Sequence, residues 1–205
     1  MTKAFAEITY TPSVKAAQQR YGSPPRPRAL EAGAAKQNEL GESESEFIGA
    51  RDGFYQATVS ETGWPYVQFR GGPVGFLKVL DSRRIGFADF RGNVQYVSVG
   101  NLDADDRVAL ILMDYANRQR LKILGRASVI DRRDDPELVA SLADPKYEAR
   151  VERAIVIAVE AYDWNCPQHI TPRFTQTEVR AAMEPLLSEL EELREIVKTM
   201  RGGDK

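Results

Sequence analysis

The sequence has very few of the side chains that form disulfides and zinc sites. Its 205 residues include one cysteine, Cys166, and one histidine, His169. A single cysteine cannot form an internal disulfide, which is typical of a reducing compartment, and these two residues are too few for a multi-ligand zinc site. No apolar run approaches the roughly 20 residues of a membrane-spanning helix, and residues 1–22 lack the apolar core of a secretory signal. We therefore expect a cytoplasmic protein with no metal site and no membrane partner.

The sequence also lacks an excess of positive charge. It has 28 basic and 30 acidic residues, a net charge of −2, whereas nucleic-acid-binding domains usually have a basic surface. We therefore expect no nucleic-acid partner. His169 is the only imidazole, and no serine has the sequence context of an activated nucleophile, which disfavours a Ser-His-Asp triad. Hydrophobic residues make up 42% of the chain, as is usual for a globular domain.

The chain divides into three predicted segments: an N-terminal arm and linker (1–45), a main domain (46–175) and a C-terminal helix (176–205). In the arm, helix-forming residues follow Pro12 and end at Gly22. The proline-rich stretch 23–28 is predicted to be extended, and residues 29–45 to form a mobile connection. A short helix is predicted near the start of the main domain, in the stretch ESEFIGARDG.

The main domain has the short alternating segments of β-strands. Two hairpins are predicted, one joining 54–60 to 64–69 through a turn at Gly63, and one joining 75–81 to 85–90. Further elements are predicted at 107–115 (a central strand), 120–131 and 153–164 (strands) and 134–144 (a helix). Six or seven strands with short connections predict a mainly β (α+β) fold, an antiparallel barrel with short flanking helices, because βαβ crossovers need longer connections.

Seven apolar residues of the C-terminal segment recur at alternating spacings of four and three. They are Val179, Met183, Leu186, Leu190, Leu193, Val197 and Met200. This is the a/d pattern of a heptad helix over about three repeats. Pro185 lies within it and predicts that the continuous helix begins there. The apolar stripe either packs on the chain's own barrel or pairs with a second chain, and we favour the second chain.

Arg70 and the residues that follow it are candidates for binding an anion. Gly71 and Gly72 leave the backbone open to a close ligand, and Gly92 is expected to open a helix at 93–100 whose N-terminus favours a phosphate. Arg70, Arg120 and this helix start would converge on one phosphate if their strands are adjacent. Taken alone, the RGG run is better explained by a turn with a solvated arginine.

Two further stretches combine polar and apolar side chains. In FRGNVQYVSVGNL (90–102), Asn93, Gln95 and Ser98 lie either on an exposed helix face or toward a ligand. In DWNCPQHITPRF (163–174), the polar side chains belong either to a loop that ends the last strand or to a wall over a flat ligand. Within it, His169 is expected to form hydrogen bonds rather than transfer protons, and Cys166 to act as a small hydrophobic residue.

From about residue 46 to 175 the sequence resembles the pyridoxamine 5′-phosphate oxidase-like family of FMN-binding split barrels, in particular its branch of oxidase-related proteins. The resemblance rests on the order of the first hairpin, Arg70, the short helix, the stretch DADDRVAL, and an arginine-rich strand that ends in GRA. It implies a six-stranded antiparallel split β-barrel, a homodimer, and two FMN sites at the subunit interface.

The resemblance also implies which residues contact the cofactor. Residues 70–72 would lie along the phosphate and ribityl chain, 88–89 against the flavin, and Arg120 where a glutamine reaches FMN. Trp164 and Arg173 would contact the ring from the other subunit. The expected cofactor-binding set is Arg70, Gly71, Gly72, Ala88, Asp89, Arg91, Asn93, Gln95, Arg120, Trp164 and Arg173, with Gln168 and His169 as weaker substrate contacts.

The sequence departs from the family at two points that concern the phosphates. The family's basic pair is replaced by Asn-Val-Gln at 93–95, so phosphate binding would depend on Arg70, Arg91 or Arg120. Residues 134–150 contain no counterpart of the groups that bind the substrate phosphate, and pyridoxamine phosphate is not assigned. We expect an FMN-dependent oxidoreductase that transfers hydride through flavin N5 to or from a small molecule. The alternatives are a non-catalytic flavin-binding or sensing protein, and a barrel that binds F420 or haem.

Overall fold

The computed structural model describes residues 3–23, 38–164 and 167–202. Residues 24–37, which hold most of the predicted extended and mobile stretches, lie outside these residues, as does Cys166. The prediction of a mobile connection is wrong for its last residues, because Leu40 is buried and residues 42–45 begin α3. The helices are α1 (Lys3–Thr9), α2 (Pro12–Arg20), α3 (Glu42–Gly49), α4 (Val97–Ala104), α5 (Pro136–Leu142) and α6 (Gln176–Gly202). The strands are β1 (Gly53–Val59), β2 (Pro65–Gly71), β3 (Lys78–Asp81), β4 (Arg84–Phe90), β5 (Arg107–Asp114), β6 (Gln119–Asp131) and β7 (Val151–Trp164).

The strands form one antiparallel sheet of seven strands in the order β2-β1-β5-β6-β7-β4-β3. The predicted antiparallel α+β architecture is confirmed, but the sheet has seven strands where the family resemblance implied six. Both predicted hairpins are present, and Gly63 takes the left-handed conformation, φ 83°, that its turn requires. The predicted helices at 12–22, 44–53 and 134–144 correspond to α2, α3 and α5.

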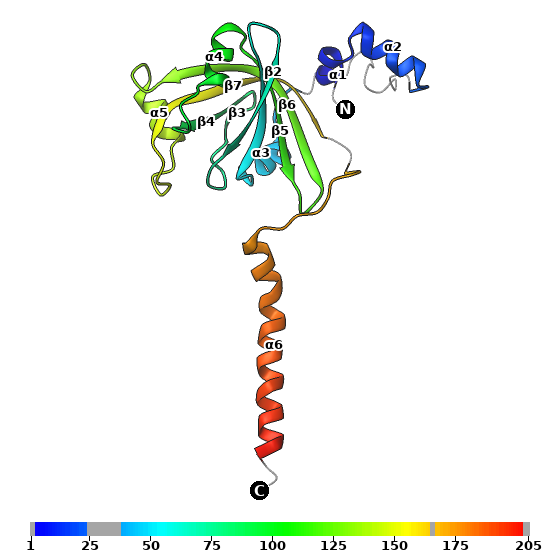
Figure 1. The fold of residues 1–205 in the computed structure, drawn as a ribbon, viewed down its shortest axis with the longest axis vertical. Coiled ribbons are helices and arrows are strands. Elements are labelled where there is room, and N and C mark those ends of the chain that lie inside the picture. Colours follow the sequence, from blue (N-terminus) through cyan, green and yellow to red (C-terminus); the bar gives the residue numbers. More distant parts are fainter. Residues whose placement is uncertain (1–2, 24–37, 165–166, 203–205) are drawn as a thin grey trace.

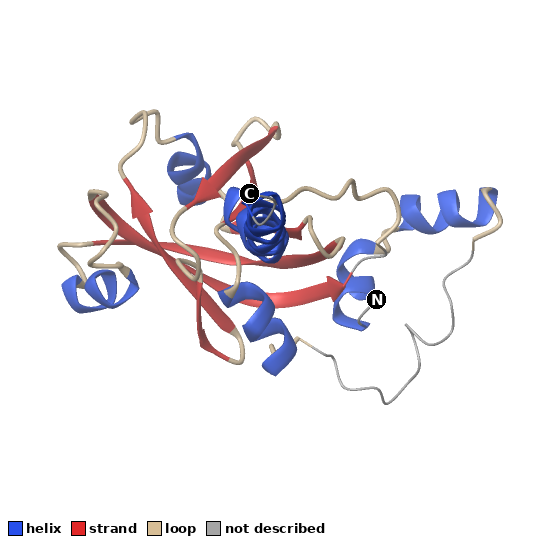
Figure 2. Ribbon diagram, turned by 90° about the horizontal axis from the view of Figure 1, so that it is seen from below, coloured by secondary structure: helices blue, strands red, loops and turns tan. Residues whose placement is uncertain are grey.

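The sheet is strongly curled (Figures 1 and 2). The curl brings its first and sixth strands, β2 and β4, close to each other. Arg70 on β2 and Asp89 on β4 are joined by an ion pair with 2.6 Å between Nη1 and Oδ1. Below this pair, the ring of Phe54 stacks on Phe76 at 5.6 Å and meets Phe87 edge-on at 5.3 Å. No backbone ladder connects β2 to β4, and we call the gap between these two strands the split. The ion pair and the aromatic cluster join its two sides.

The core lies inside this curl. In β5 every second residue is buried, including Leu110 and Leu112, as the alternation of side chains across a strand requires. Leu121 and Ile123 of β6 and Ile155 of β7 are fully buried beside them. Ala4 and Phe5 pack with Ala161 outside the main core, where α1 lies against β7 (Figure 1).

Helix α6 extends away from the sheet as a single rod (Figure 1). The prediction that the continuous helix begins at Pro185 is wrong, because α6 begins at Gln176 and passes through the proline. A capping box at Thr175 and Glu178 explains this start. The Glu178 N–H donates to Thr175 Oγ1 at 3.2 Å, and the Thr175 N–H donates to Glu178 Oε2 at 2.7 Å. These bonds satisfy N–H groups that the first turn cannot pair internally.

Candidate functional site

The segment between β4 and α4 is strained. We predicted a helix at 93–100, but α4 begins at Val97, because Val94 (φ 56°) and Tyr96 (φ 53°) take the left-handed conformation. Such angles cost roughly 1–2 kcal/mol for a residue other than glycine, and they are rarest for a β-branched side chain such as valine. Gln95 lies between the two without a positive φ. Turns that contain left-handed residues present backbone N–H groups to anions in many proteins. In this turn the Gln95 N–H donates to Asn93 Oδ1 at 3.2 Å.

The strained segment closes one side of a hollow of about 250 Å³, which we name the α4 pocket. Its walls come from β2, β4, the start of β7 and the segment before α4. The lining residues are Tyr66, Gln68, Arg70, Asp89, Phe90, Gly92, Asn93, Val94, Gln95, Tyr96, Val97, Ser98, Val99 and Glu152. Tyr66, Gln68 and Arg70 are alternate residues of β2, so one face of this strand forms a wall of the pocket.

Charged side chains meet at the edge of the α4 pocket. Asp89 is 2.6 Å from Arg70 Nη1 and 3.6 Å from Arg153 Nη1. Arg153 also contacts Glu152 at 2.7 Å, and Arg91 lies 3.8 Å from Glu152. Three guanidinium groups therefore accompany two carboxylates, which leaves an excess of one positive charge beside the pocket.

Arg70 has unused hydrogen-bonding capacity. Its Nε is buried and has no partner among the described residues, although a buried N–H without an acceptor is unfavourable. Its partner Asp89 has a raised pKa, because burial of the carboxyl outweighs the opposing attraction of Arg70 and Arg153. Since an arginine stays protonated, Arg70 is a fixed positive charge with a free donor, as an anionic ligand requires.

Polar side chains also occupy the interior beneath α4. Ser98 donates to Gln68 Oε1 at 2.8 Å, and Asn101 donates to Thr58 Oγ1 at 2.9 Å. Gln56, opposite Gln68 in the β1–β2 register, is fully buried, and both its amide atoms lack a partner in the described structure. Buried amides without partners are unfavourable in a core, which makes Gln56 a feature that packing does not explain.

The structure brings several of the predicted cofactor residues together. Arg70, Asp89, Asn93 and Gln95 line the α4 pocket. Gly71 and Ala88 line an adjoining hollow of about 130 Å³ that also includes Arg70 and Asp89. Gly72 is packed against the ring of Phe76, which lies 2.7 Å from where a Cβ would be. Arg91 reaches the same group of charges through Glu152.

Other predicted residues lie elsewhere in the chain. Arg70 and Arg120 do not converge, because β1 and β5 lie between their strands. Trp164 donates from Nε1 to Glu44 Oε1 at 2.6 Å. Gln168 and His169 are exposed in a turn, with His169 at φ 62°.

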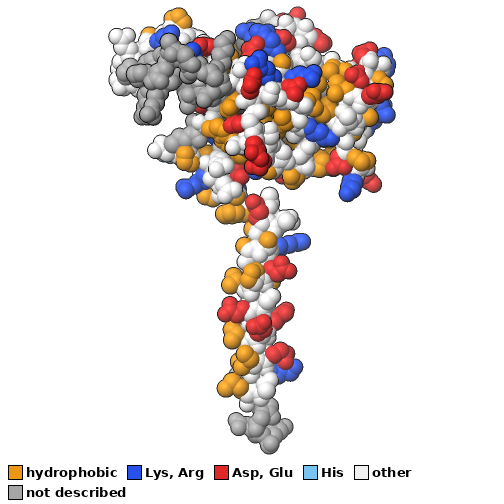
Figure 3. All heavy atoms as spheres, turned by 180° about the vertical axis from the view of Figure 1, so that it is seen from behind, with side chains coloured by type: hydrophobic (Ala, Val, Ile, Leu, Met, Phe, Trp, Pro, Cys, Tyr) orange, Lys and Arg blue, Asp and Glu red, His pale blue; other side chains and the backbone are white. Residues whose placement is uncertain are grey.

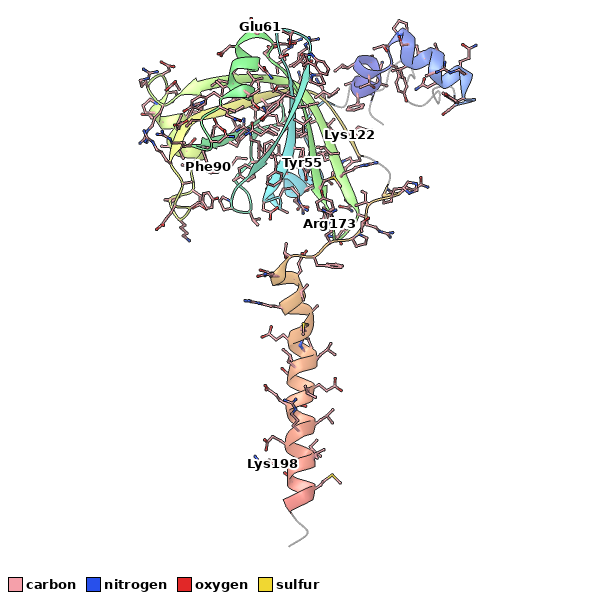
Figure 4. All side chains as sticks on the ribbon, viewed as in Figure 1. Tyr55, Glu61, Phe90, Lys122, Arg173 and Lys198 are labelled. Atoms are coloured by element: carbon pink, nitrogen blue, oxygen red, sulfur yellow. The ribbon has the colours of Figure 1, made fainter. Side chains whose placement is uncertain are left out.

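Arg173 lies over the ring of Tyr115 at 5.1 Å, near the start of α6 and away from Phe90 at the α4 pocket (Figure 4). It lines a separate hollow of about 260 Å³. In the described part of the chain, Trp164, Gln168, His169 and Arg173 are therefore not among the residues that line the α4 pocket.

The sequence reasoning missed Tyr66, Gln68, Glu152 and Arg153. The alternation of β2 was the available signal for the first two, because it places them on the same face as Arg70. Nothing comparable pointed to Glu152 and Arg153, since their position depends on how the curl brings β7 beside β4.

Comparison with solved structures supports the fold. A variant of HupZ from Group A Streptococcus is 14% identical, with a TM-score of 0.51 over 62% of this chain and 99% of that one. A second HupZ structure is 12% identical, with a TM-score of 0.50 over 66% and 99%. A proposed pyridoxamine 5′-phosphate oxidase from Lactobacillus delbrueckii is 21% identical, with a TM-score of 0.49 over 62% and 95%. From the two HupZ structures we take the fold alone.

The class of protein that this fold defines is the antiparallel split barrel. The family described as pyridoxamine 5′-phosphate oxidase matches residues 41–168, more than half of the chain. The chain belongs to this family, as the resemblance indicated. No curated protein matches the sequence significantly. Among the helices of the described residues, none is long and apolar enough to cross a membrane.

Proposed function

We propose that this protein binds FMN at the split of its sheet and acts as a flavin oxidoreductase on a small molecule. The observation that carries the proposal is Arg70, a buried cation whose Nε has no partner among the described residues, in a pocket that is also lined by the left-handed residues Val94 and Tyr96. Membership of the pyridoxamine 5′-phosphate oxidase family supports a flavin as the anion. The proposed binding unit is the segment 46–175.

The residues of the α4 pocket fit the phosphate end of such a cofactor. Arg70 offers a charge-assisted hydrogen bond, which is stronger than a neutral one. Asn93 and Gln95 lie at the entrance, where the Asn93 Nδ2 donates to Gln95 Oε1 at 3.1 Å, and both amides can turn toward a ligand. Arg91 and Arg153 add positive charge that the carboxylates of the site do not fully offset.

A second copy of the chain completes this proposed site. The α4 pocket measures about 250 Å³, below the roughly 300–1,000 Å³ that is usual for ligand pockets. A flavin held by its phosphate there would leave its ring outside the pocket. Trp164 and Arg173, which are away from the α4 pocket of their own chain, are available to contact the ring bound to a partner. We therefore propose a homodimer with the cofactor at its interface.

A bound flavin would supply hydride transfer, and the protein would supply orientation and electrostatics. Arg70 holds its position through Asp89, so its charge is fixed before the cofactor binds and needs little reorganisation. Ser98 and Gln68 are already hydrogen-bonded to each other and keep the wall of the pocket rigid. The substrate is a small molecule that reaches the ring side of the site.

The first test is the visible absorption spectrum of the purified protein before and after addition of FMN. The proposal predicts a bound-flavin spectrum with one flavin per chain. Reduction by NAD(P)H and reoxidation by an acceptor would then favour an enzyme over a flavin-binding sensor. A protein that ignores FMN at high concentration but binds F420 or haem would contradict the choice of cofactor.

A titration with FMN tests the residues. Arg70→Ala is expected to weaken FMN binding by about 1–3 kcal/mol, the range for losing a charge-assisted hydrogen bond. Arg84→Ala is the control, because Arg84 is exposed and pairs with Asp81 away from the pocket. Circular dichroism on both variants separates lost affinity from lost folding. Equal FMN affinity in folded Arg70→Ala and in the wild type would contradict the assignment.

A further inference from the structure

Helix α6 has an apolar stripe that its own chain does not cover. Figure 3 shows apolar side chains along this helix. Every described side chain from Gln176 to Met200 is exposed, including Leu186 at 65% and Leu193 at 52%. Most of the stability of helices in proteins comes from packing of an apolar face. A helix of 27 residues, about 40 Å long at 1.5 Å per residue, therefore needs a partner for this face.

We infer that α6 pairs with α6 of a second copy in a parallel two-stranded coiled coil. The seven residues of the stripe occupy consecutive a and d positions of a heptad, with d at Val179, Leu186, Leu193 and Met200 and a at Met183, Leu190 and Val197. Leucine at the two central d positions is typical of two-stranded coils, as is β-branched Val197 at an a position. This pairing does not depend on the flavin.

The charges beside the stripe fix the direction of the pairing. In a parallel coil, each g residue faces the e residue of the next heptad on the partner. Glu189 occupies a g position and Arg194 the following e position, so Glu189 faces Arg194 of the partner on both sides of the coil. At the neighbouring pair, Ala182 faces Leu187, which extends the apolar contact. The pattern is thus complementary in the parallel arrangement.

The antiparallel arrangement lacks this complementarity. Where the same seven residues are aligned in opposite directions, g faces g and e faces e. Glu189 then lies opposite Glu189 of the second copy, and Arg194 lies opposite Leu187, so no oppositely charged pair forms. The two glutamates would repel each other, and Arg194 would border an apolar residue. Charge complementarity therefore selects the parallel coil.

Pro185 is compatible with this seam. It occupies a c position, on the side of the helix away from the partner, so its ring does not enter the a/d layers. A parallel coil also has a two-fold axis along its length, which is the symmetry of the commonest homodimers. Both barrels then lie at the same end of the coil, where the sheet of each can meet the other.

Cross-linking of single cysteines tests the direction in the full-length chain, with Cys166 replaced by Ser. In a parallel coil, Leu186→Cys and Met200→Cys each face themselves across the seam, within reach of a disulfide, and each is expected to give a covalent dimer on oxidation. Ser188→Cys, at an outward f position, is the control and is expected to remain monomeric under denaturing electrophoresis. Absence of dimer at both Leu186→Cys and Met200→Cys would overturn the parallel coil.

Substitutions in the seam and at its flanks test the energetics by sedimentation equilibrium. Leu190→Asp is expected to raise the dimer dissociation constant more than about tenfold, the effect of 1.4 kcal/mol, whereas the outward Ser188→Asp leaves it unchanged. Arg194→Glu is expected to weaken the dimer, and Glu189→Arg in addition to restore it. A dimer unaffected by Leu190→Asp or by Arg194→Glu contradicts the pairing. FMN binding is read separately from the flavin spectrum, so a failed coil and a failed flavin site give different results.

Discussion

Arg70 provides the sharpest test of how the split is held closed. Replacing it with methionine keeps much of the aliphatic length and removes the guanidinium that joins β2 to β4. The Arg70 and Asp89 side chains are 12% and 8% exposed, so the change leaves a carboxylate short of a partner in a nearly buried position. Removing one member of a buried pair is far more destabilising than breaking an exposed one.

The size of this loss of stability follows from the distances between the charged groups. At an effective dielectric of about 20, unit charges 2.6 Å apart attract by about 6 kcal/mol. Arg153, at 3.6 Å from Asp89, attracts it by about 5 kcal/mol on the same basis and stays in place in the variant. We therefore expect Arg70→Met to lower the free energy of unfolding by about 3 kcal/mol, the lower end of the range for broken buried pairs.

The loss of unfolding free energy in Arg70→Met should depend on pH. The pKa of Asp89 is already raised by burial, and removing Arg70 takes away an attraction that lowers it, so the variant's pKa is higher still. When the folded state raises the pKa of a carboxyl group, the protein loses stability as pH rises through that pKa. The variant's deficit should therefore be small at acidic pH, where Asp89 is neutral and needs no cation, and should grow as pH rises and Asp89 ionises.

Urea unfolding followed by tryptophan fluorescence measures both effects, without added cofactor. Arg84→Met, which breaks an exposed pair with Asp81, is the control and should stay close to wild-type stability at each pH. The double variant Arg70→Met, Asp89→Asn should recover part of the loss, because it removes the uncompensated charge. A deficit no larger than that of the control, or one independent of Asp89, would refute the reasoning.

Three further predictions concern packing, titration and the buried amide. Gly125→Ala should destabilise the fold by about 1–3 kcal/mol through overpacking, since a Cβ there would lie 2.5 Å from the Ala158 carbonyl oxygen; Gly100→Ala, whose Cβ meets nothing within 4 Å, is the control in urea unfolding. Hydrogen bonds from Arg107 lower the pKa of Asp105 to about 2. The contribution of the Asp105 carboxylate to stability should therefore disappear as pH falls through that value. Arg107→Gln should move the pKa of Asp105, followed by NMR, toward 3.8. Gln56→Met should raise the unfolding free energy by about 1–2 kcal/mol, because it removes two unpaired buried polar atoms; a lower midpoint in urea would show that the amide has a partner.

The sequence was sufficient to predict the features that depend on residues close together along the chain. Strand alternation and the glycine at the turn predicted the first hairpin, and the heptad spacing predicted α6. Local signals also misled in one place. Gly92 and Asn93 resemble a helix start, but the left-handed angles at Val94 and Tyr96 delay α4 by one turn. Those angles are not preferred by either residue, and the surrounding structure imposes them.

The site could be predicted only in part, because it is made by the curl of the sheet. Arg70 and Asp89 are 19 residues apart and lie on strands that do not pair, so no spacing rule connects them. Arg120, on β6, is separated from Arg70 by β1 and β5, which no spacing along the chain could show. Gln56 carried no signal in the sequence, and β1 buries it on the same face as Phe54 and Thr58.

The strand order has a consequence for how the chain folds. β7 forms ladders with both β6 and β4, and pairs Ala158 with Arg84, 74 positions earlier in the chain. Such distant pairings slow folding, because the loop must close before its contacts form. Until residue 164 has been synthesised, β1, β2, β5 and β6 can form one ribbon and β3 and β4 another, each with an uncovered strand edge open to other chains. The pairing of β7 with β6 and β4 is therefore the step that completes the native sheet and covers the strand edges through which the nascent protein could aggregate.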